Sequence, residues 1–405
     1  MIENNGEKSA CPRFPFGPRR PVELEPEFAQ LRREAPVSRV ELPYGGQAWL
    51  LTRMTETKAM LNDTRLSRKA MQGDRPRLTK QQLVDLGDLA MMEPAAHTRA
   101  RRLIVQAFRK CPAEGMRREV TEIVDDLLDR MMVKGPTGDL AADFASLLPS
   151  RVICLLLGVP YEDWDKLGGY IRTLVMQDAN TGGNAATSAM FSMISYFASL
   201  IAARRREPGD DLISALLQAT NGDDAFTDEE VKMHAVTIFI AGYETTSCQI
   251  VNSVCALLKH PDKLKWLQEN PDAMPNAVEE LLRYAPLTDA AMPQVATEDL
   301  ELGGVTIRKG EVVIPSPVSA NHDEAVFERA DELDLRRGSE LNQHVAFGHG
   351  SRYCIGAPIA RLELQVALGA IFRRMPDISL AVPEEELRLK SALAIRGFDH
   401  FPINW

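Results

Sequence analysis

The stretch from Thr227 to His260 is the feature that most restricts how this chain can fold. It opens with TDEE, a capping box that satisfies the first free backbone N–H groups of a helix. The helical pattern then continues for roughly 30 residues, or about 45 Å, as far as Pro261. Its centre, AVTIFIAGY, is apolar on all faces. Because such a helix must be covered on every side, we expect it to run through the core.

Most of the remaining chain also has a helical pattern, as in the segment from Glu119 to Lys134, where apolar residues recur at i, i+3, i+4 and i+7. Strand patterns are fewer: AWLLT near residue 50, the segment from Asp299 to Pro315, and the C-terminal ALAIRGFDHFPINW. The sequence shows no internal repeat or low-complexity linker. The predicted fold class is mainly α, a single large helical domain over residues 1–405 with a small β-rich portion and an irregular segment over residues 1–20.

The composition excludes several classes of protein. The 405 residues carry a net charge of −10, which argues against broad nucleic-acid binding. No apolar run approaches the ~20 residues of a membrane span, and the N-terminal MIENNGEKSA has no apolar signal core. The six cysteines form no CxxC pair and no zinc-like spacing. We therefore expect a cytoplasmic protein with free thiols that binds neither nucleic acid nor membrane.

Cys354 stands in a glycine-rich turn within FGHGSRYCIGAPIARLE, and the apolar spacing that follows predicts a helix beginning near Pro358. A helix N-terminus offers free N–H groups and a partial positive charge, which favour a thiolate over a thiol. From the residues alone, such a thiolate is a nucleophile, a redox sensor or a metal ligand, and a buried structural cysteine is the alternative. The glycine pattern favours a functional cysteine.

The same stretch resembles the heme-binding signature of the cytochromes P-450 at Phe347, Gly348, Cys354 and Gly356. The resemblance implies a P-450-like helical fold with heme b as the cofactor, these residues around it, and Cys354 as the proximal ligand of the iron. In that family the thiolate pushes electron density onto iron and favours cleavage of the O–O bond. The resemblance covers nearly the whole chain, and its soluble form is similar to bacterial members that tailor macrolides and other polyketides.

The long helix contains AGYETTS, from Ala241 to Ser247. Gly242 costs a helix about 1 kcal/mol relative to alanine, so we expect it to provide space or a local distortion. The Thr245 hydroxyl can bond the carbonyl of residue 241, and from the residues alone an ordinary back-bonded threonine is the simplest interpretation. The stretch is similar to the oxygen-binding motif of the family, which implies that Thr245 hydrogen-bonds dioxygen and that Glu244 relays protons from solvent.

Two further motifs are similar to family elements. In VEELLRY, Glu280 and Arg283 share a helix face and would alone be a weak surface ion pair; the resemblance implies a buried structural pair that holds the loop before the cysteine. In HTRARR, His97 and Arg101 also share a face and would alone be a solvated basic helix start. The resemblance implies that both, together with Arg352, contact the heme propionates.

One position departs from the family pattern. Relatives commonly have a propionate-binding arginine just before the Ala-Thr-Glu-Asp segment, where this chain has Gln294. Glutamine donates a hydrogen bond but brings no charge. Neutralisation of the propionates would then rest on Arg101, Arg352 and His97, and we expect Gln294→Arg to tighten heme retention.

Candidate substrate contacts come from family position only, and ordinary core packing is the alternative for each. Their small or flexible side chains suit a sizeable apolar substrate. They are Thr237, Ile240, Ala241, Ala290, Met292 and Ile395. Residues 181–184, between two helical stretches, are either a lid hinge or a passive loop.

The resemblance implies a monooxygenase that inserts one oxygen atom from O2 into an apolar natural product, a polyketide, macrolide or terpenoid, by hydroxylation or epoxidation. Its electrons would come from NAD(P)H through a ferredoxin reductase and a ferredoxin. A basic docking face for the ferredoxin is one interpretation of the nearby cations, and scattered surface charge is the other. These cations are Arg101, Arg102, Arg109, Lys110 and Arg361.

Two rival interpretations use fewer of these motifs. A cysteine hydrolase would use Cys354 with His349 or His344 as the base, and it leaves the other motifs unexplained. A non-enzymatic heme sensor would keep the thiolate ligand but would not need Glu244 and Thr245 beside oxygen.

Overall fold

The computed structural model describes residues 11–17, 22–79, 89–175, 184–285, 287–390 and 395–405. Residues 181–183 of the candidate hinge, and most of the segment predicted to be irregular at the N-terminus, lie outside this part. Of that N-terminal segment, residues 11–17 form no helix. They are nevertheless anchored, because Phe14 and Phe16 are buried edge-to-face against Phe28.

Helices make up most of the described chain, as expected, and the helix predicted near 119–134 is present as α4. In chain order the helices are α1 (Pro26–Glu34), α2 (Met54–Asn62), α3 (Pro94–Lys110), α4 (Arg117–Met132), α5 (Leu148–Leu157), α6 (Trp164–Val175), α7 (Asn184–Arg206), α8 (Leu212–Gln218), α9 (Asp228–Leu258), α10 (Pro261–Glu269), α11 (Met274–Tyr284), α12 (Pro317–Ala320) and α13 (Ala357–Arg374).

The strands are short. They are β1 (Val37–Leu42), β2 (Gly46–Leu51), β3 (Leu66–Ser67), β4 (Thr137–Asp139), β5 (Thr220–Asn221), β6 (Asp224–Ala225), β7 (Gln294–Ala296), β8 (Leu300–Leu302), β9 (Val305–Ile307), β10 (Val312–Pro315), β11 (Ser379–Leu380) and β12 (Pro402–Asn404).

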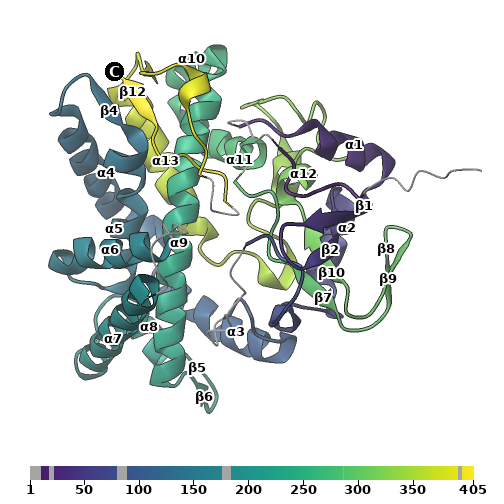
Figure 1. Cartoon of the computed structure of the whole chain (residues 1–405). Coiled ribbons are helices and arrows are strands. Elements are labelled where there is room, and N and C mark those ends of the chain that lie inside the picture. The colour runs from purple at the N-terminus through teal and green to yellow at the C-terminus, as the bar shows by residue number, and fades with distance from the viewer. Residues whose placement is uncertain (1–10, 18–21, 80–88, 176–183, 286, 391–394) are drawn as a thin grey trace, which may run out of the picture.

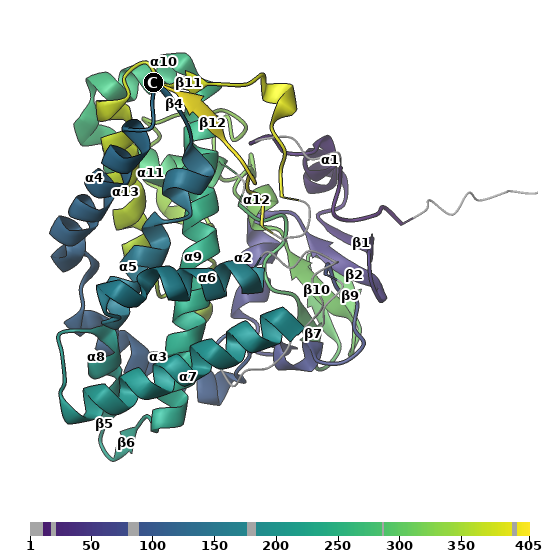
Figure 2. The same cartoon turned by 60° about the vertical axis from the view of Figure 1, so that its left-hand side comes forward.

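Helix α9 is the long central helix that the sequence predicts. Its capping box is formed, since Thr227 and Glu230 each bond the other's backbone N–H. Figure 1 shows α9 running between the helices α4 to α8 on one side and the strand-rich part on the other, and in Figure 2 the helices α6 and α7 cross in front of it. It packs against α5, α7 and α13, which cover its apolar faces.

The largest sheet has the strand order β1-β2-β10-β7-β3. Strands β2 and β10 are parallel although they are far apart in the sequence, and the other pairs are antiparallel. The described part of the C-terminal stretch supplies one strand, β12, which pairs with β4 and β11 rather than with a second strand from the same stretch. This arrangement brings the region around residue 50, the segment 294–315 and α2 to one side of α9 (Figure 1).

Among the described residues, one helix has the length and the hydropathy of a membrane span, the part of α7 from Ala185 to Arg206, and 28% of its apolar 18-residue window is buried. This match rests on length and composition alone. In the structure α7 packs along α6, α8 and α9, as part of the helical layer.

Candidate functional site

One cavity of about 430 Å³ is lined by residues of α3, α9, α13 and the loop that leads to Cys354. It brings together residues from both of the longest motifs, although more than 100 positions separate Thr245 from Cys354 in the sequence. The predicted site residues that line it are His97, Arg101, Thr237, Ala241, Thr245, Arg283, Phe347, Arg352, Cys354 and Gly356.

Four of the predicted substrate contacts are not among the described residues that line this cavity. Ile240 packs against the main core instead. Ala290 belongs to the core beneath the five-stranded sheet, and Met292 is half-buried just before β7. Ile395 pairs with Thr288, which does line the cavity. Their roles in substrate binding remain predictions.

The backbone of the cysteine loop requires glycine at Gly350. This residue has a φ of +67°, and a Cβ there would lie 2.0 Å from Oδ1 of Asn62 on α2. Gly348 also has a positive φ, of +76°, and it shapes the turn without lining the cavity. The Cys354 N–H donates to the carbonyl of Phe347 at 2.8 Å, which closes the loop. The Cys354 side chain is therefore held by backbone geometry.

Cys354 is exposed by surface area, but the surface that it exposes faces the cavity. Burial raises the pKa of its thiol above the usual value, while the N–H groups of Gly356 and Ala357 and the charges of Arg101 and Arg361 act to lower it. The helix start therefore favours the thiolate, as the sequence predicts, but burial outweighs it in the protein alone. A coordinated metal ion would deprotonate such a thiol.

Three arginines, Arg68, Arg101 and Arg352, surround His97 at one side of the cavity. The one acid among the described lining residues is Glu363, whose pKa is raised well above its usual value by burial, so this carboxyl favours the neutral form. The pKa of His97 is lowered to about 4 by burial and by the charges of Arg352, Arg101 and Arg68. A site of this kind requires an anionic ligand.

This set of groups fits heme b. Cys354 offers a sulfur ligand to iron, and the apolar residues of α9 and α13 offer walls to a flat ring. The cations at the edge offer partners to the two carboxylates of its propionates. Gln294 does not share in this, because it is buried in β7 and is not among the described residues that line the cavity.

The α9 wall of the cavity explains Gly242. A Cβ at this position would lie 3.2 Å from Cδ1 of Ile153 on α5, so glycine allows the two helices to approach closely. Thr245 Oγ1 donates to the carbonyl of Ala241 at 2.9 Å, which is the back-bond expected from the sequence. The Thr245 hydroxyl oxygen can still accept a hydrogen bond, or the hydroxyl can turn to donate one into the cavity.

Glu244 lies on a different face of α9 from Thr245. Its carboxylate forms an ion pair with Lys390 and also accepts a hydrogen bond from the Cys248 thiol at 3.4 Å. Glu244 is 7% exposed and is not among the described lining residues. The structure thus places this carboxylate beside the cavity wall, where it is held by a cation that the motif gives no sign of.

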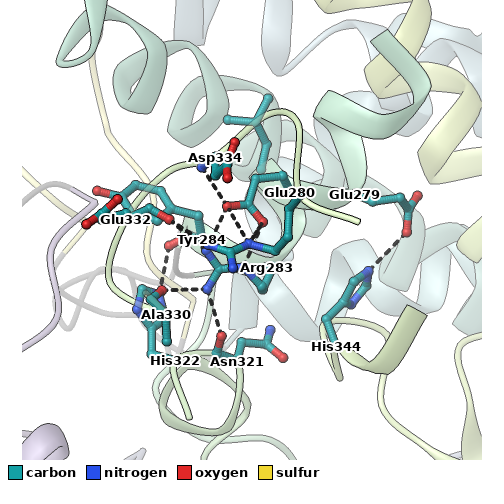
Figure 3. Close-up of polar contacts among 12 residues, drawn as sticks. Glu279, Glu280, Arg283, Tyr284, Asn321, His322, Ala330, Glu332, Asp334 and His344 are labelled. Atoms are coloured by element: carbon teal, nitrogen blue, oxygen red, sulfur yellow. Dashed lines mark hydrogen bonds and ion pairs between the residues drawn. The ribbon is translucent and has the colours of Figure 1, made fainter. Parts of the chain in front are cut away.

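The Glu280–Arg283 pair is buried at the centre of a hydrogen-bond network (Figure 3). Arg283 donates twice to Glu280, at 2.7 Å each, and its other donors reach backbone carbonyls of the segment 321–332. Arg337 adds a second guanidinium on Glu280, and the Asp334 N–H donates to the same carboxylate at 2.9 Å. The network therefore fixes the chain that precedes the cysteine loop.

A second network lies on the other side of α11. Glu279 accepts one hydrogen bond from His344, which Figure 3 shows, and two more from Arg361. Arg361 also stacks over the Phe347 ring at 4.5 Å.

The role of His344 as a hydrolytic base finds no support, because both ring nitrogens are engaged, with Glu279 and with the Ala346 N–H. Arg361 is likewise committed to Glu279 rather than free on a docking face.

Three residues that sequence reasoning missed belong to this site: Arg68, Lys390 and Glu363. Arg68 and Lys390 reach it from segments far away in the sequence, and no local pattern marks either one. Glu363 could have been found, since it falls on the apolar face of the helix that begins after Cys354, and a carboxylate there must be buried.

Comparisons with known proteins agree with this site. The family model for cytochrome P-450 matches residues 186–274 and 272–376. The mycinamicin IV hydroxylase/epoxidase of Micromonospora griseorubida is 42% identical over 98% of this chain and 100% of that protein. The nocardicin C N-oxygenase of Nocardia uniformis subsp. tsuyamanensis is 41% identical over 97% of this chain and 98% of that protein.

The fold of the chain also matches that of a solved structure. A structure of the mixed-function P-450 MycG, a variant in complex with mycinamicin V, superposes with a TM-score of 0.92. It is 41% identical and covers 97% of this chain and 100% of the other. With the sulfur, the apolar walls and the cations gathered around one cavity, these likenesses establish that the chain belongs to the cytochrome P-450 family and is a monooxygenase of natural-product metabolism with heme b as its cofactor.

Proposed function

We propose that the protein inserts one oxygen atom into a sizeable apolar natural product, a polyketide, macrolide or terpenoid, by hydroxylation or epoxidation. In hydroxylation a C–H bond becomes C–OH, and the second oxygen atom of O2 leaves as water. The reaction consumes two electrons and two protons, which NAD(P)H and one solvent proton supply. When bound, heme b supplies the iron at which O2 is activated.

The observation that carries this proposal is that Cys354 and Thr245 line one cavity. Cys354 would hold the iron, and its loop is fixed by backbone hydrogen bonds and by the Arg361 network. Thr245 would position O2 through its hydroxyl, while Glu244 would deliver protons from outside the cavity wall. The structural role of Glu280 and Arg283 would be to hold the segment 321–334 in place.

The substrate class rests on the cavity and the relatives. The α9 residues Thr237 and Ala241 face the cavity, as does Val318, and they offer mostly apolar contact. The two relatives named above are described as acting on mycinamicin IV and nocardicin C. Since these names specify two different substrates, family membership supports a natural product as the substrate without choosing among its classes.

For the electron donor we propose a ferredoxin that docks near α3. A second hollow of about 580 Å³ is lined by Arg101, Arg102 and Arg109 beside the cavity. Arg109 is exposed and has no charged partner among the described residues, whereas Arg102 lies 3.9 Å from Asp224. An acidic ferredoxin would complement this surface despite the negative charge of the whole chain.

We place the protein in the cytoplasm. All six cysteines are free, which suits a reducing compartment.

Two measurements test this proposal: the absorption spectrum of the carbon monoxide complex, and then an assay of product formation. The reduced protein treated with carbon monoxide should show the far red-shifted Soret band of thiolate-ligated heme, and Cys354→Ser should abolish it. Purified protein supplied with a ferredoxin, its reductase and NADPH should then oxygenate a compound that shifts the ferric spectrum. A normal thiolate spectrum without any product across macrolide, polyketide and terpenoid panels would favour a heme sensor instead.

A further inference from the structure

We propose that Arg68 is a heme-propionate-binding residue and supplies the positive charge that position 294 lacks. Arg68 follows strand β3 and lines the cavity together with His97, Arg101 and Arg352. The proposal rests on heme b lying against Cys354, which the carbon monoxide spectrum tests separately.

The Arg68 guanidinium has unused hydrogen-bond donors. Its Nε has no hydrogen-bond partner within the described chain, and Nη1 reaches only the Ala90 carbonyl, at 3.5 Å. Arg352 beside it differs, because it donates to three carbonyls, those of Leu89, Ala90 and Met92. A largely buried guanidinium without partners is costly to the protein, and a carboxylate in the cavity would remove that cost.

The electrostatics of the neighbours agree with this geometry. Burial and the charge of Arg352 lower the pKa of Arg68 to about 10, so the charge on this side chain is disfavoured as long as no anion is near. Arg68 is also one of the charges that lower the pKa of His97. The cations of this side of the cavity therefore repel one another, and a dianionic ligand would relieve all of them.

The strand register brings positions 68 and 294 together. Strand β3 is antiparallel to β7, with Leu66 opposite Ala296 and Ser67 opposite Val295. The next pair in this register would set Arg68 opposite Gln294. Directly opposed like charges destabilise a sheet, so a neutral residue at 294 is compatible with the cation at 68. The expectation that Gln294→Arg tightens heme retention therefore changes: the gain should be small while Arg68 is present.

The test is the rate at which heme leaves the protein for an apo-globin acceptor. Arg68→Gln should accelerate heme loss about tenfold, the effect of one charge-assisted hydrogen bond. Lys69→Gln is the matched control, because it removes the same charge from an exposed neighbour that does not line the cavity. Equal rates for Arg68→Gln and the wild type, or equal acceleration by Lys69→Gln, would overturn the proposal.

Two further measurements separate propionate binding from a merely structural role. Reconstitution with heme dimethyl ester, which lacks the carboxylates, should erase the difference between Arg68→Gln and the wild type. The thermal unfolding temperature of the apo-protein should be unchanged or slightly higher in Arg68→Gln, because the substitution removes an unpartnered charge. A difference that persists with the ester, or a destabilised apo-protein, would assign Arg68 to folding alone.

The proposed pairing of positions 68 and 294 can be tested separately. Gln294→Arg should slow heme loss clearly in the Arg68→Gln background, since it returns a cation to the same place from the neighbouring strand. In the wild-type background it should change heme loss less than about threefold, because the two guanidinium groups would compete. Equal gains in both backgrounds would show that the two positions act independently, and would contradict the compensation between them.

Discussion

Lys390 forms an ion pair with Glu244, the residue that directly precedes Thr245 on α9. Burial opposes the charge of Lys390, but the ion pair with the Glu244 carboxylate outweighs it and raises the pKa of the ammonium group. A lysine whose pKa is raised keeps its charge throughout the neutral range. The ammonium group therefore stays charged at neutral pH, and the proton delivery that we propose for Glu244 would take place beside a fixed positive charge.

We accordingly predict that Lys390→Met shifts the pH dependence of turnover. Without the ammonium group the Glu244 carboxylate keeps only the Cys248 donor, and the loss of a neighbouring cation disfavours the charged form of a carboxyl group. The alkaline limit of product formation per NADPH should therefore move upward. Lys265→Met, at an exposed lysine, is the control. Coincident pH profiles for Lys390→Met and the wild type would show that Glu244 takes no part in the proton relay.

The hydroxyl of Thr245 gives the second prediction. Thr245→Val keeps the shape but loses the hydroxyl that faces the cavity. NADPH and O2 should still be consumed, but product per NADPH should fall at least about tenfold, with the remainder released as peroxide. Ser247→Ala, two residues along the same helix, should stay coupled. An undiminished product yield from Thr245→Val would remove Thr245 from the mechanism.

The third prediction concerns the buried network of Figure 3. Arg283→Lys keeps the charge but cannot reach Glu280 and three backbone carbonyls at once. It should destabilise the folded protein by about 3–5 kcal/mol, the typical cost of breaking a buried pair. Arg130→Lys, in the surface pair with Asp126, should cost less than about 0.5 kcal/mol. Denaturant unfolding measures both, and equal effects would deny the pair its structural role.

Some features of the fold and the site could be predicted from the sequence and others could not, for physical reasons. The capping box at Thr227 and the glycines around Cys354 are local signals, because each satisfies backbone groups within a few residues. Helical geometry also decides which α9 residues face the cavity: Thr237 and Ala241 are four apart and share a face, while Ile240 is turned about 100° away from Ala241. A family position alone does not give that rotation.

The partners that tertiary structure brings in could not be predicted. Lys390 lies 146 positions from Glu244, and it depends on pairing between Leu389 and Phe398 near the C-terminus. Arg68 depends on the register of β3 against β7. Both strand contacts join only one or two residue pairs, so the sequence pattern carries no period from which they could be read.

The fourth prediction concerns docking of the electron donor. Arg109→Glu reverses a charge that is exposed on α3 and has no charged partner among the described residues. The rate of the first electron transfer from a ferredoxin should fall several-fold at low ionic strength, and the difference should shrink as salt is added. Arg118→Glu, on α4, is the control. A rate for Arg109→Glu that equals that of the wild type at all salt concentrations would contradict docking at this face.

The fifth prediction compares two glutamates whose pKa values move in opposite directions. Burial raises the pKa of Glu363, which is 3% exposed and whose Oε2 has no partner in the described chain. For Glu279 burial also acts to raise the pKa, but Arg361 and His344 outweigh it and hold the pKa at about 2. Glu363 therefore costs stability increasingly as the pH rises above 4.5, the usual pKa of glutamate, whereas Glu279 contributes stability above pH 4.5 that is lost as the pH falls towards 2.

Replacing each glutamate by glutamine should reveal its opposite effect on the free energy of unfolding. Glu363→Gln should stabilise the protein relative to the wild type, by an amount that grows between pH 5 and pH 8 by at most about 1.4 kcal/mol per pH unit. Glu279→Gln should destabilise it by an amount that is constant over that range and shrinks only in acid, because the wild-type carboxylate then becomes protonated as well. Unfolding free energies measured at several pH values decide the matter. A Glu363→Gln difference that does not depend on pH would mean that this carboxyl group is ionised in the folded protein, and that water or a cation reaches it behind the cysteine loop.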